Sequence, residues 1–413
     1  MATKLIIVWL LTGAIAACSK GVTTSVEIAS PAIGHASLVD GYVPLGVFED
    51  ANIYGGDTIK FEAMLKDLRA HGLDTVLFTN NVAARDAQLL DVSDRMGMNV
   101  FMLPTHDLYR DWWPDKVPAN IQTARAVAQP IVDLWSKHPS LKGYVVIDEP
   151  PLKLRQKVKL MVQAFRELDP SRPAIMTLIG KNRVGPIFEA AKPDVMQIDV
   201  YPAGKDNLPC DFTMTGFAYT DVDFVSYIRG VTAARQATTP LWIIMQTHSF
   251  DAGIHSLRTP SRAEVRMQHW LAVGEGATGF YWFVYSTQQS WIGLKDNAEL
   301  YDEVADLARR TRPLNTLLLS LHKDDDHFSI SGQGDPYVST LVTPDDTRTY
   351  AVAVNRDCVQ AQKLTITSDD LKRSLRDVET GAIYALGADI EFQPGDGKVF
   401  EVVDVAHVPV LLR

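Results

Sequence analysis

The sequence is short of cysteine and of the motifs that bind metals and nucleotides. Its 413 residues include 3 cysteines, too few for a disulfide scaffold. Cys210 and Cys358 lie far apart in the sequence and are expected in different domains, so we expect two free thiols rather than a disulfide. No cysteine and histidine residues have the spacing of a metal-ligand set. We therefore expect no metal and no cofactor.

An excess of positive charge is also absent. The chain has 40 Lys and Arg residues against 50 Asp and Glu residues, which gives a net charge of −10 without an acidic tail. This balance disfavours nucleic acid and anionic membrane surfaces as partners. With 46% hydrophobic and 22% charged residues, the composition is that of a globular protein and argues against disorder. The length allows one large domain and one smaller domain.

The N-terminus has the features of a targeting segment. Lys4 supplies a positive charge, Leu5–Leu11 is apolar, and Ile15-Ala-Ala-Cys18 has the form of a bacterial lipobox. The alternative is an ordinary secretory peptide that is cleaved after Ala17.

We therefore predict an exported bacterial lipoprotein, with a signal peptide over residues 1–18 and a flexible leader over residues 19–40. Acyl chains on Cys18 would anchor the mature protein to a membrane, in the periplasm or at the cell surface, without a transmembrane helix.

Apolar runs alternate with amphipathic helical stretches from Tyr42 onward. The strand-like runs are Val43–Phe48, Thr75–Thr79, Val100–Pro104, Tyr144–Ile147, Ile175–Ile179, Val195–Val200, Leu241–Met245 and Phe280–Tyr285. Eight such units predict an α/β fold, a (β/α)₈ TIM barrel, over residues 41–322. A doubly wound sheet is the alternative, but it requires a glycine-rich phosphate turn, which we do not find.

Short alternating runs with turn residues between them replace this pattern near the C-terminus. They are Tyr337–Val342, Tyr350–Val354, Leu364–Thr367, Ile383–Leu386 and Val399–Val403. Such a pattern is typical of antiparallel strands, so we predict a small β-sandwich over residues 323–413.

Polar and aromatic residues follow the ends of the barrel strands, which converge on one pocket in a TIM barrel. The candidates are Glu49, Asn80, His106, Asp148, Glu149, Asp199, Tyr201, Gln246, His248, Trp282 and Tyr285. Carboxylates and amides bind sugar hydroxyls, and flat rings pack against sugar C–H faces. The pocket is therefore predicted to bind a carbohydrate substrate. Trp112 and Trp113 either join this pocket or pack within a loop.

Glu149 is the first candidate for catalysis, because Gly143–Pro151 is an apolar run that ends in two acids and two prolines. The prolines end the strand and fix the direction of its tip. Asp148 would bind substrate or, alternatively, only cap a helix. His106 and His248 are expected to form hydrogen bonds in the pocket wall rather than to bind metal.

The motif Asp148-Glu149-Pro150 resembles the Asn-Glu-Pro motif of the clan-A glycoside hydrolase barrels. The resemblance continues through Asp199–Pro202, Leu241–Gln246 and Gly274–Phe283, which are similar to bacterial glycosidase-like proteins. It implies a hydrolase that cleaves O-glycosidic bonds, with Glu149 as the general acid/base.

One residue departs from that clan. Gln246 stands where the nucleophilic glutamate is expected, and an amide cannot form a glycosyl-enzyme ester. Asp199 or Glu49 would then be the second carboxylate, in a retaining or an inverting reaction. The alternative is a carbohydrate-binding or cell-envelope interaction protein that has a TIM barrel without catalysis.

Overall fold

The computed structural model describes residues 41–109, 118–214, 219, 221–236, 238–251, 256–288, 291–324, 327–369 and 373–404. The predicted signal peptide with Cys18, the predicted leader, and Trp112 and Trp113 lie outside these residues, as does the side chain of His106. Among the helices that are described, none is long and apolar enough to span a membrane.

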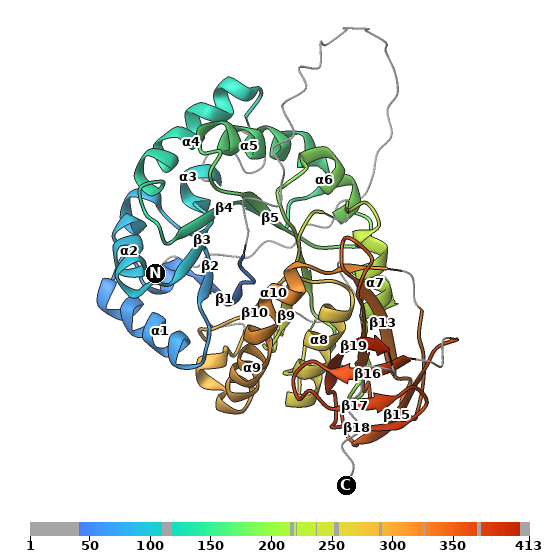
Figure 1. The fold of residues 1–413 in the computed structure, drawn as a ribbon. Coiled ribbons are helices and arrows are strands. Elements are labelled where there is room, and N and C mark those ends of the chain that lie inside the picture. Colours follow the sequence, from blue (N-terminus) through green and yellow to red (C-terminus); the bar gives the residue numbers. More distant parts are fainter. Residues whose placement is uncertain are drawn as a thin grey trace, which may run out of the picture. The chain divides into compact units, whose positions relative to one another are not determined.

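Eight parallel strands close into a barrel in the order β1-β10-β9-β6-β5-β4-β3-β2 (Figure 1). They are β1 (Leu45–Asp50), β2 (Thr75–Thr79), β3 (Asn99–Met102), β4 (Leu141–Asp148), β5 (Ala174–Leu178), β6 (Met196–Val200), β9 (Leu241–Gln246) and β10 (Gly279–Phe283). The short strands β7 (Thr213–Met214) and β8 (Val222–Asp223) pair outside the barrel. The predicted (β/α)₈ fold is therefore confirmed, and β9 and β10 are its seventh and eighth strands.

Helices surround this barrel. They are α1 (Thr58–Ala70), α2 (Ala83–Met96), α3 (Thr105–Tyr109), α4 (Ile121–Trp135), α5 (Arg155–Leu168), α6 (Val184–Ala191), α7 (Phe224–Thr232), α8 (Arg262–Gly274), α9 (Ala298–Thr311) and α10 (Asn315–Leu319). Side-chain caps start several of them. Asp57 accepts hydrogen bonds from the backbone N–H groups of Ile59 and Lys60, and Asn297 accepts one from Leu300.

Aromatic rings fill the centre of the barrel. Phe101 of β3 packs edge-on against Trp242 of β9, with the ring centroids 5.0 Å apart, and Trp242 also packs against Tyr281. Because β3 and β9 are not neighbours, this contact crosses the barrel. A Cβ atom on Gly279 would lie 2.3 Å from the Trp242 ring, so glycine makes room for the indole. The barrel interior is therefore a packed core rather than a pore.

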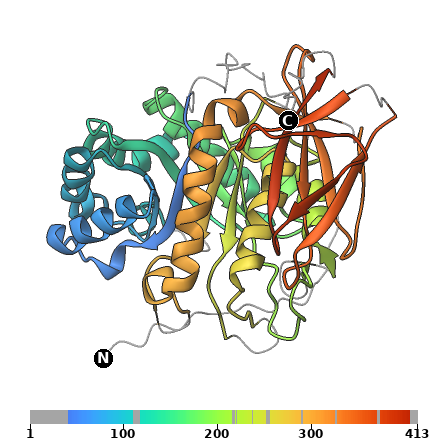
Figure 2. The ribbon, with the colours of Figure 1, turned by 60° about the horizontal axis from the view of Figure 1, so that its bottom comes forward.

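The chain after the barrel forms two antiparallel sheets (Figure 2), which confirms the predicted β-sandwich. One sheet has the order β11-β13-β14-β19-β16-β17 and the other β12-β15-β18. Their bounds are β11 (His322–Lys323), β12 (Ser329–Ser331), β13 (Tyr337–Val342), β14 (Thr349–Val354), β15 (Gln362–Thr367), β16 (Arg373–Asp377), β17 (Ile383–Ala385), β18 (Asp389–Phe392) and β19 (Gly397–Asp404).

Strand β14 shows how the larger sheet uses both of its faces. Ala351 and Ala353 belong to the small core between the two sheets. The alternate residues Tyr350, Val352 and Val354 belong to the main core, and β14 contacts α8. This is the period-two alternation of a strand whose two faces are both covered.

The two cysteines lie at a contact between the barrel and the sandwich. Cys210 and Cys358 are free thiols, as expected. Cys210 lies in a barrel loop and Cys358 in the sandwich, and the two domains meet at this point, because the backbone N–H of Cys358 donates a hydrogen bond to Sγ of Cys210 over 2.8 Å. A long separation in the sequence did not reveal this contact, since the sandwich packs against a loop of the barrel.

Candidate active site

The tip of β4 breaks the regular alternation of a strand. The pairing register with β5 shifts between Val145 and Asp148, which is the mark of a bulge, and Asp148 pairs with Thr177. Glu149 then adopts a left-handed backbone with φ of 44°, and its N–H donates to the carbonyl of Thr177 over 3.0 Å. Non-glycine residues in this region are strained and often lie at functional sites.

The bulge and the left-handed backbone together allow the side chains of Asp148 and Glu149 to point toward the same side of the barrel. The Asp148 carboxyl lies beside Thr177, whose hydroxyl donates to Oε1 of Gln197 over 3.0 Å, and the Glu149 carboxyl lies beside Asp199 of β6. On Asp199, Oδ1 also accepts a hydrogen bond from the Tyr201 hydroxyl over 2.9 Å. Three of the predicted acids, Asp148, Glu149 and Asp199, therefore meet at the C-terminal end of the barrel.

The three carboxyls retain protons more strongly than isolated ones. Loss of part of its hydration at the barrel mouth, followed by the Glu149 charge, raises the pKa of Asp148, although its side chain stays exposed at the end of β4. Burial also raises the pKa of Glu149, although the hydrogen bond with Asp199 and the Arg183 charge act against it. The pKa of Asp199 is raised by burial and then by the charges of Glu149 and Asp148. Because all three pKa values are raised, the cluster is suited to hold a proton near neutral pH and to donate it.

An aromatic wall stands beside the acids. The Tyr201 ring lies 5.1 Å from His248 and 5.7 Å from Phe283, centroid to centroid. Phe283 also packs against Phe48 and Trp291, at 4.8 Å and 5.4 Å. The tips of β1, β6, β9 and β10 thus bring their rings together on one side of the mouth. Phe283 and Trp291 were not among the residues predicted from the sequence.

His248 is held as a neutral ring in this wall. Its Nδ1 lies 3.0 Å from the carbonyl oxygen of Phe283, and burial lowers the pKa of His248 to about 4. A carbonyl oxygen only accepts hydrogen bonds, so Nδ1 carries the proton and Nε2 is the acceptor.

Gln246 is fully buried and held by the loops around it. Its Oε1 accepts from the N–H of Ala203 over 2.7 Å, and Nε2 donates to the carbonyls of Arg258, His248 and Ala203 at 2.9, 3.1 and 3.3 Å. The amide is therefore occupied in joining the loops after β6 and β9. Its predicted role in sugar binding stays a prediction, and its location favours a structural one.

Glu49 lies at the tip of β1 but is fully buried. It accepts hydrogen bonds from the N–H groups of Asp50 and Ser286 at 2.8 and 3.0 Å, which joins the ends of β1 and β10. Burial nevertheless raises the pKa of Glu49 to about 8. No interaction between Glu49 and the three clustered acids is found among the described residues, so the structure does not bring it to them.

Two predicted aromatic residues point away from the mouth. Trp282 is buried against His269 of α8, with the rings stacked 5.9 Å apart. The Tyr285 hydroxyl donates to Asp67 of α1 over 2.9 Å. Asn80 does follow β2, with φ of 55°, and its backbone N–H donates to the Thr105 hydroxyl. The sugar-binding roles of these residues and of His106 stay predictions.

Two polar neighbours of the acids were missed at the sequence level. Arg183 precedes α6 and acts on Glu149 through its charge, and Thr177 lies in the middle of an apolar strand. The position of Arg183 in the loop after the fifth strand could have suggested it, since every such loop of a TIM barrel opens on the mouth. Thr177 gave no comparable signal.

A cavity of about 410 Å³ adjoins the aromatic wall. Its lining comes from the loops that follow β6, β9 and β10, and includes Lys205, Phe250, Arg258 and Trp291. Phe250 and Trp291 pack with ring centroids 6.1 Å apart. Since Trp291 also contacts Phe283, the cavity and the wall share a side chain. The dimensions suit a ligand of a few sugar rings.

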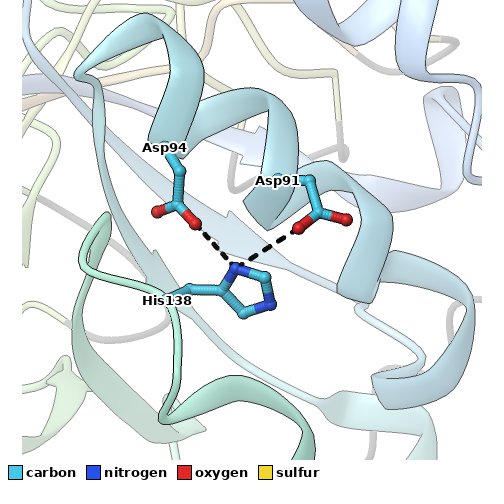
Figure 3. A group of neighbouring side chains, drawn as sticks. All are labelled: Asp91, Asp94 and His138. Atoms are coloured by element: carbon cyan, nitrogen blue, oxygen red, sulfur yellow. Dashed lines mark hydrogen bonds and ion pairs between the residues drawn. The ribbon is translucent and has the colours of Figure 1, made fainter.

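A separate group of side chains has the composition of a metal site. Asp91 and Asp94 of α2 face Nδ1 of His138, at 3.7 and 2.7 Å (Figure 3). Asp94 also accepts from the N–H of Ser140 over 2.8 Å. Although burial opposes it, these hydrogen bonds hold the pKa of Asp94 below its usual value. The group therefore ties the end of α2 to the start of β4, at the end of the barrel opposite the acids.

No model of a known protein family and no curated protein matches this sequence. Among solved structures it is similar to a glycoside hydrolase, with a TM-score of 0.57, 12% identity, and coverage of 89% of this chain and 94% of the other. A putative alpha-galactosidase from Bacteroides fragilis NCTC 9343 gives 0.53 and 11%, over 88% and 79% of the chains. A beta-galactosidase from the psychrophilic Marinomonas ef1 gives 0.52 and 14%, over 68% and 62%. At these identities the likeness shows the fold, a TIM barrel that this chain has in common with solved glycoside hydrolases.

Proposed function

We propose that this protein is a glycoside hydrolase that cleaves O-glycosidic bonds of an extracytoplasmic poly- or oligosaccharide, with Glu149 as the general acid/base. The observation that carries the proposal is the group of three carboxyls at the barrel mouth, whose pKa values are all raised. A glycosidase needs a carboxyl that is still protonated near neutral pH, so that the leaving oxygen receives a proton.

Asp199 is assigned a role in sharing a proton with Glu149, and not the role of the second catalytic carboxylate on the opposite side of the glycosidic bond. Paired carboxyls stand about 5–5.5 Å apart in retaining enzymes and about 6.5–9.5 Å apart in inverting ones. Glu149 and Asp199 are close neighbours that act on one another: the contact with Asp199 lowers the pKa of Glu149, and the contact with Glu149 raises the pKa of Asp199. We therefore assign to Asp199, held by the Tyr201 hydroxyl, a proton that it shares with Glu149 and that Glu149 delivers to the leaving oxygen.

Asp148 is the clustered carboxyl that is most open to solvent. We assign to it the binding of a sugar hydroxyl. The partly exposed rings of Tyr201 and Phe283, backed by the buried His248, supply flat surfaces for the C–H faces of the sugar.

A carbohydrate-binding protein without catalysis is the second candidate. It is favoured by Gln246, because the tip of the seventh strand bears a buried amide where a retaining enzyme of this kind has its nucleophile. Binding would still use the aromatic wall and Asp148.

Release of reducing ends from a panel of glycans separates the two candidates. We expect turnover by the wild type, a loss of about 10²- to 10⁴-fold in kcat for Glu149→Gln with little change in binding, and weaker binding with residual turnover for Asp148→Asn. Glu189→Gln, an exposed change on α6, is the matched control and keeps wild-type rates. A glycan that both wild type and Glu149→Gln bind equally, without turnover by either, would establish the binding protein.

We further propose that the protein is exported and anchored by acyl chains on Cys18, as its lipobox suggests. Incorporation of labelled palmitate in a bacterial host tests this directly. Label that is present in the wild type and absent in Cys18→Ser supports the anchor, whereas equal labelling of both contradicts it.

A further inference from the structure

Cys210 and Cys358 meet where the barrel touches the sandwich. Cys210 lies in the loop between β6 and α7, and Cys358 lies in the turn after β14. The Cys358 N–H donates to Sγ of Cys210 over 2.8 Å, and Sγ of Cys358 itself lies 4.0 Å from Sδ of Met267. Residues 148 positions apart in the chain are thus in direct contact.

Hydrogen bonds hold the backbone on both sides of this contact. The N–H of Cys210 donates to Oε1 of Glu264 over 3.0 Å, and Arg258 fixes that carboxylate through bonds of 2.6 and 2.8 Å. On the other side, Oδ1 of Asp357 accepts from the N–H groups of Val359 and Gln360, at 2.8 and 2.9 Å. The hydrogen bonds within the two loops therefore hold the two cysteines next to each other.

Both side chains are partly exposed, so a small oxidant reaches them. We propose that Cys210 and Cys358 form a redox-active dithiol whose oxidation produces a disulfide between the β6–α7 loop and the sandwich. The proposal is independent of the glycosidase activity, because neither cysteine lies among the mouth residues.

Oxidation by a small disulfide, such as oxidised glutathione, would proceed by thiol–disulfide exchange. The Cys210 thiolate attacks one sulfur of the oxidant, so one molecule of glutathione leaves and a mixed disulfide forms on Cys210. The Cys358 thiol then loses its proton to solvent, and its sulfur attacks Sγ of Cys210, which releases the second glutathione. Two protein thiols are oxidised and one disulfide is reduced to two thiols.

The environment of Cys358 determines the order of these steps. Burial, followed by the neighbouring Cys210 thiol, raises the pKa of Cys358. Because the thiolate is the attacking form, Cys358 is the slower nucleophile, and closure of the disulfide is expected to accelerate as pH rises.

Closing so long a segment of chain restricts the unfolded state more than the folded one. We therefore expect the oxidised protein to melt about 5 °C higher than the reduced protein. The tied loop begins at Tyr201 and Ala203, which border the mouth, so oxidation also restrains this edge of the candidate site.

The test uses the full-length purified protein after incubation with oxidised glutathione or with dithiothreitol. After unfolding and alkylation with iodoacetamide, peptide mapping reports each cysteine separately, including Cys18. We expect a linked peptide that contains Cys210 and Cys358 in the oxidised sample alone, and both residues alkylated after reduction. Cys210→Ser and Cys358→Ser are the matched controls, in which the remaining thiol carries glutathione and the melting temperature no longer depends on the oxidant.

Two results would overturn the proposal. Either both thiols are alkylated after oxidation, or they carry glutathione without becoming linked. The comparison of oxidised and reduced wild type requires no variant, so it remains decisive if a serine substitution prevents folding.

Discussion

The side chain of Gln246 binds both backbone polar groups of Ala203, accepting from the N–H over 2.7 Å and donating to the carbonyl over 3.3 Å. This pairing joins the loop after the sixth barrel strand to the tip of the seventh. It gives a structural reason for an amide at this position, because a carboxylate has no hydrogens to donate to the surrounding carbonyls.

Gln246→Glu tests that reason. The change restores the residue type expected of a retaining glycosidase, but it places a carboxylate against three carbonyl oxygens. We expect the free energy of unfolding to fall by about 3 kcal/mol or more, with no gain in glycosidase activity. Urea denaturation measures the loss, and Gln156→Glu, exposed on α5, is the control. A variant of normal stability that hydrolyses glycans faster would show that Gln246 is open to the substrate.

The barrel was predictable from the sequence because each of its strands is short, apolar and bounded by turn residues. The run Thr75–Thr79 coincides with β2, and the other seven runs overlap their strands with small shifts at the ends. Several strands of the sandwich were not predicted, such as β16 (Arg373–Asp377). Its five residues, Arg-Ser-Leu-Arg-Asp, include a single apolar side chain, so no alternating pattern marks the strand.

The candidate site was only partly predictable, because side-chain direction depends on the backbone at each tip. Regular alternation would send Asp148 and Glu149 to opposite faces, and it takes a bulge and a left-handed residue to bring both to the mouth. Trp282 follows ordinary alternation and faces α8 instead. Phe283, one residue further, enters the wall.

Arg310 connects the barrel to the sandwich, and its loss should be costly. The guanidinium donates to both oxygens of Glu379 at 2.9 and 2.8 Å and to Asp396 at 2.8 Å, and it lies 4.6 Å from the centre of the Trp270 ring. We expect Arg310→Met to lower the free energy of unfolding by about 3 kcal/mol, since it leaves two partly buried carboxylates without their partner.

Thermal and urea unfolding measure this effect. The control is Arg309→Met on the same helix, where the side chain is 71% exposed and a change within about 0.5 kcal/mol is expected. Equal stability of the two variants would mean that the ion pairs around Arg310 contribute little.

Glu49 should make stability depend on pH. The folded protein holds the Glu49 proton up to about pH 8, whereas the unfolded chain releases it near pH 4.5. Between these values the folded state binds more protons, so the free energy of unfolding decreases as pH rises, in total on the order of 4 kcal/mol. Glu49→Gln removes the titration, although one of its two accepted hydrogen bonds is lost.

The prediction is checked by urea denaturation at steps between pH 5 and pH 8. We expect a flatter dependence for Glu49→Gln than for the wild type and an unchanged dependence for Glu189→Gln. Parallel curves for Glu49→Gln and the wild type would show that Glu49 is ionised throughout this range.

Arg183 should set the pH above which the enzyme loses activity. A general acid works only while it is protonated, so kcat/KM is high below the pKa of Glu149 and declines as pH rises through it. The Arg183 charge lowers that pKa against the larger opposing effect of burial. Arg183→Met should therefore move the alkaline limb of the profile upward, by about 1 pH unit, whereas Arg183→Lys keeps the charge and leaves the limb near its wild-type position. The measurement is the pH dependence of kcat/KM for the wild type, Arg183→Met and Arg183→Lys on one substrate. A downward shift in Arg183→Met, or the same shift in both variants, would show that the Arg183 charge does not control the Glu149 proton.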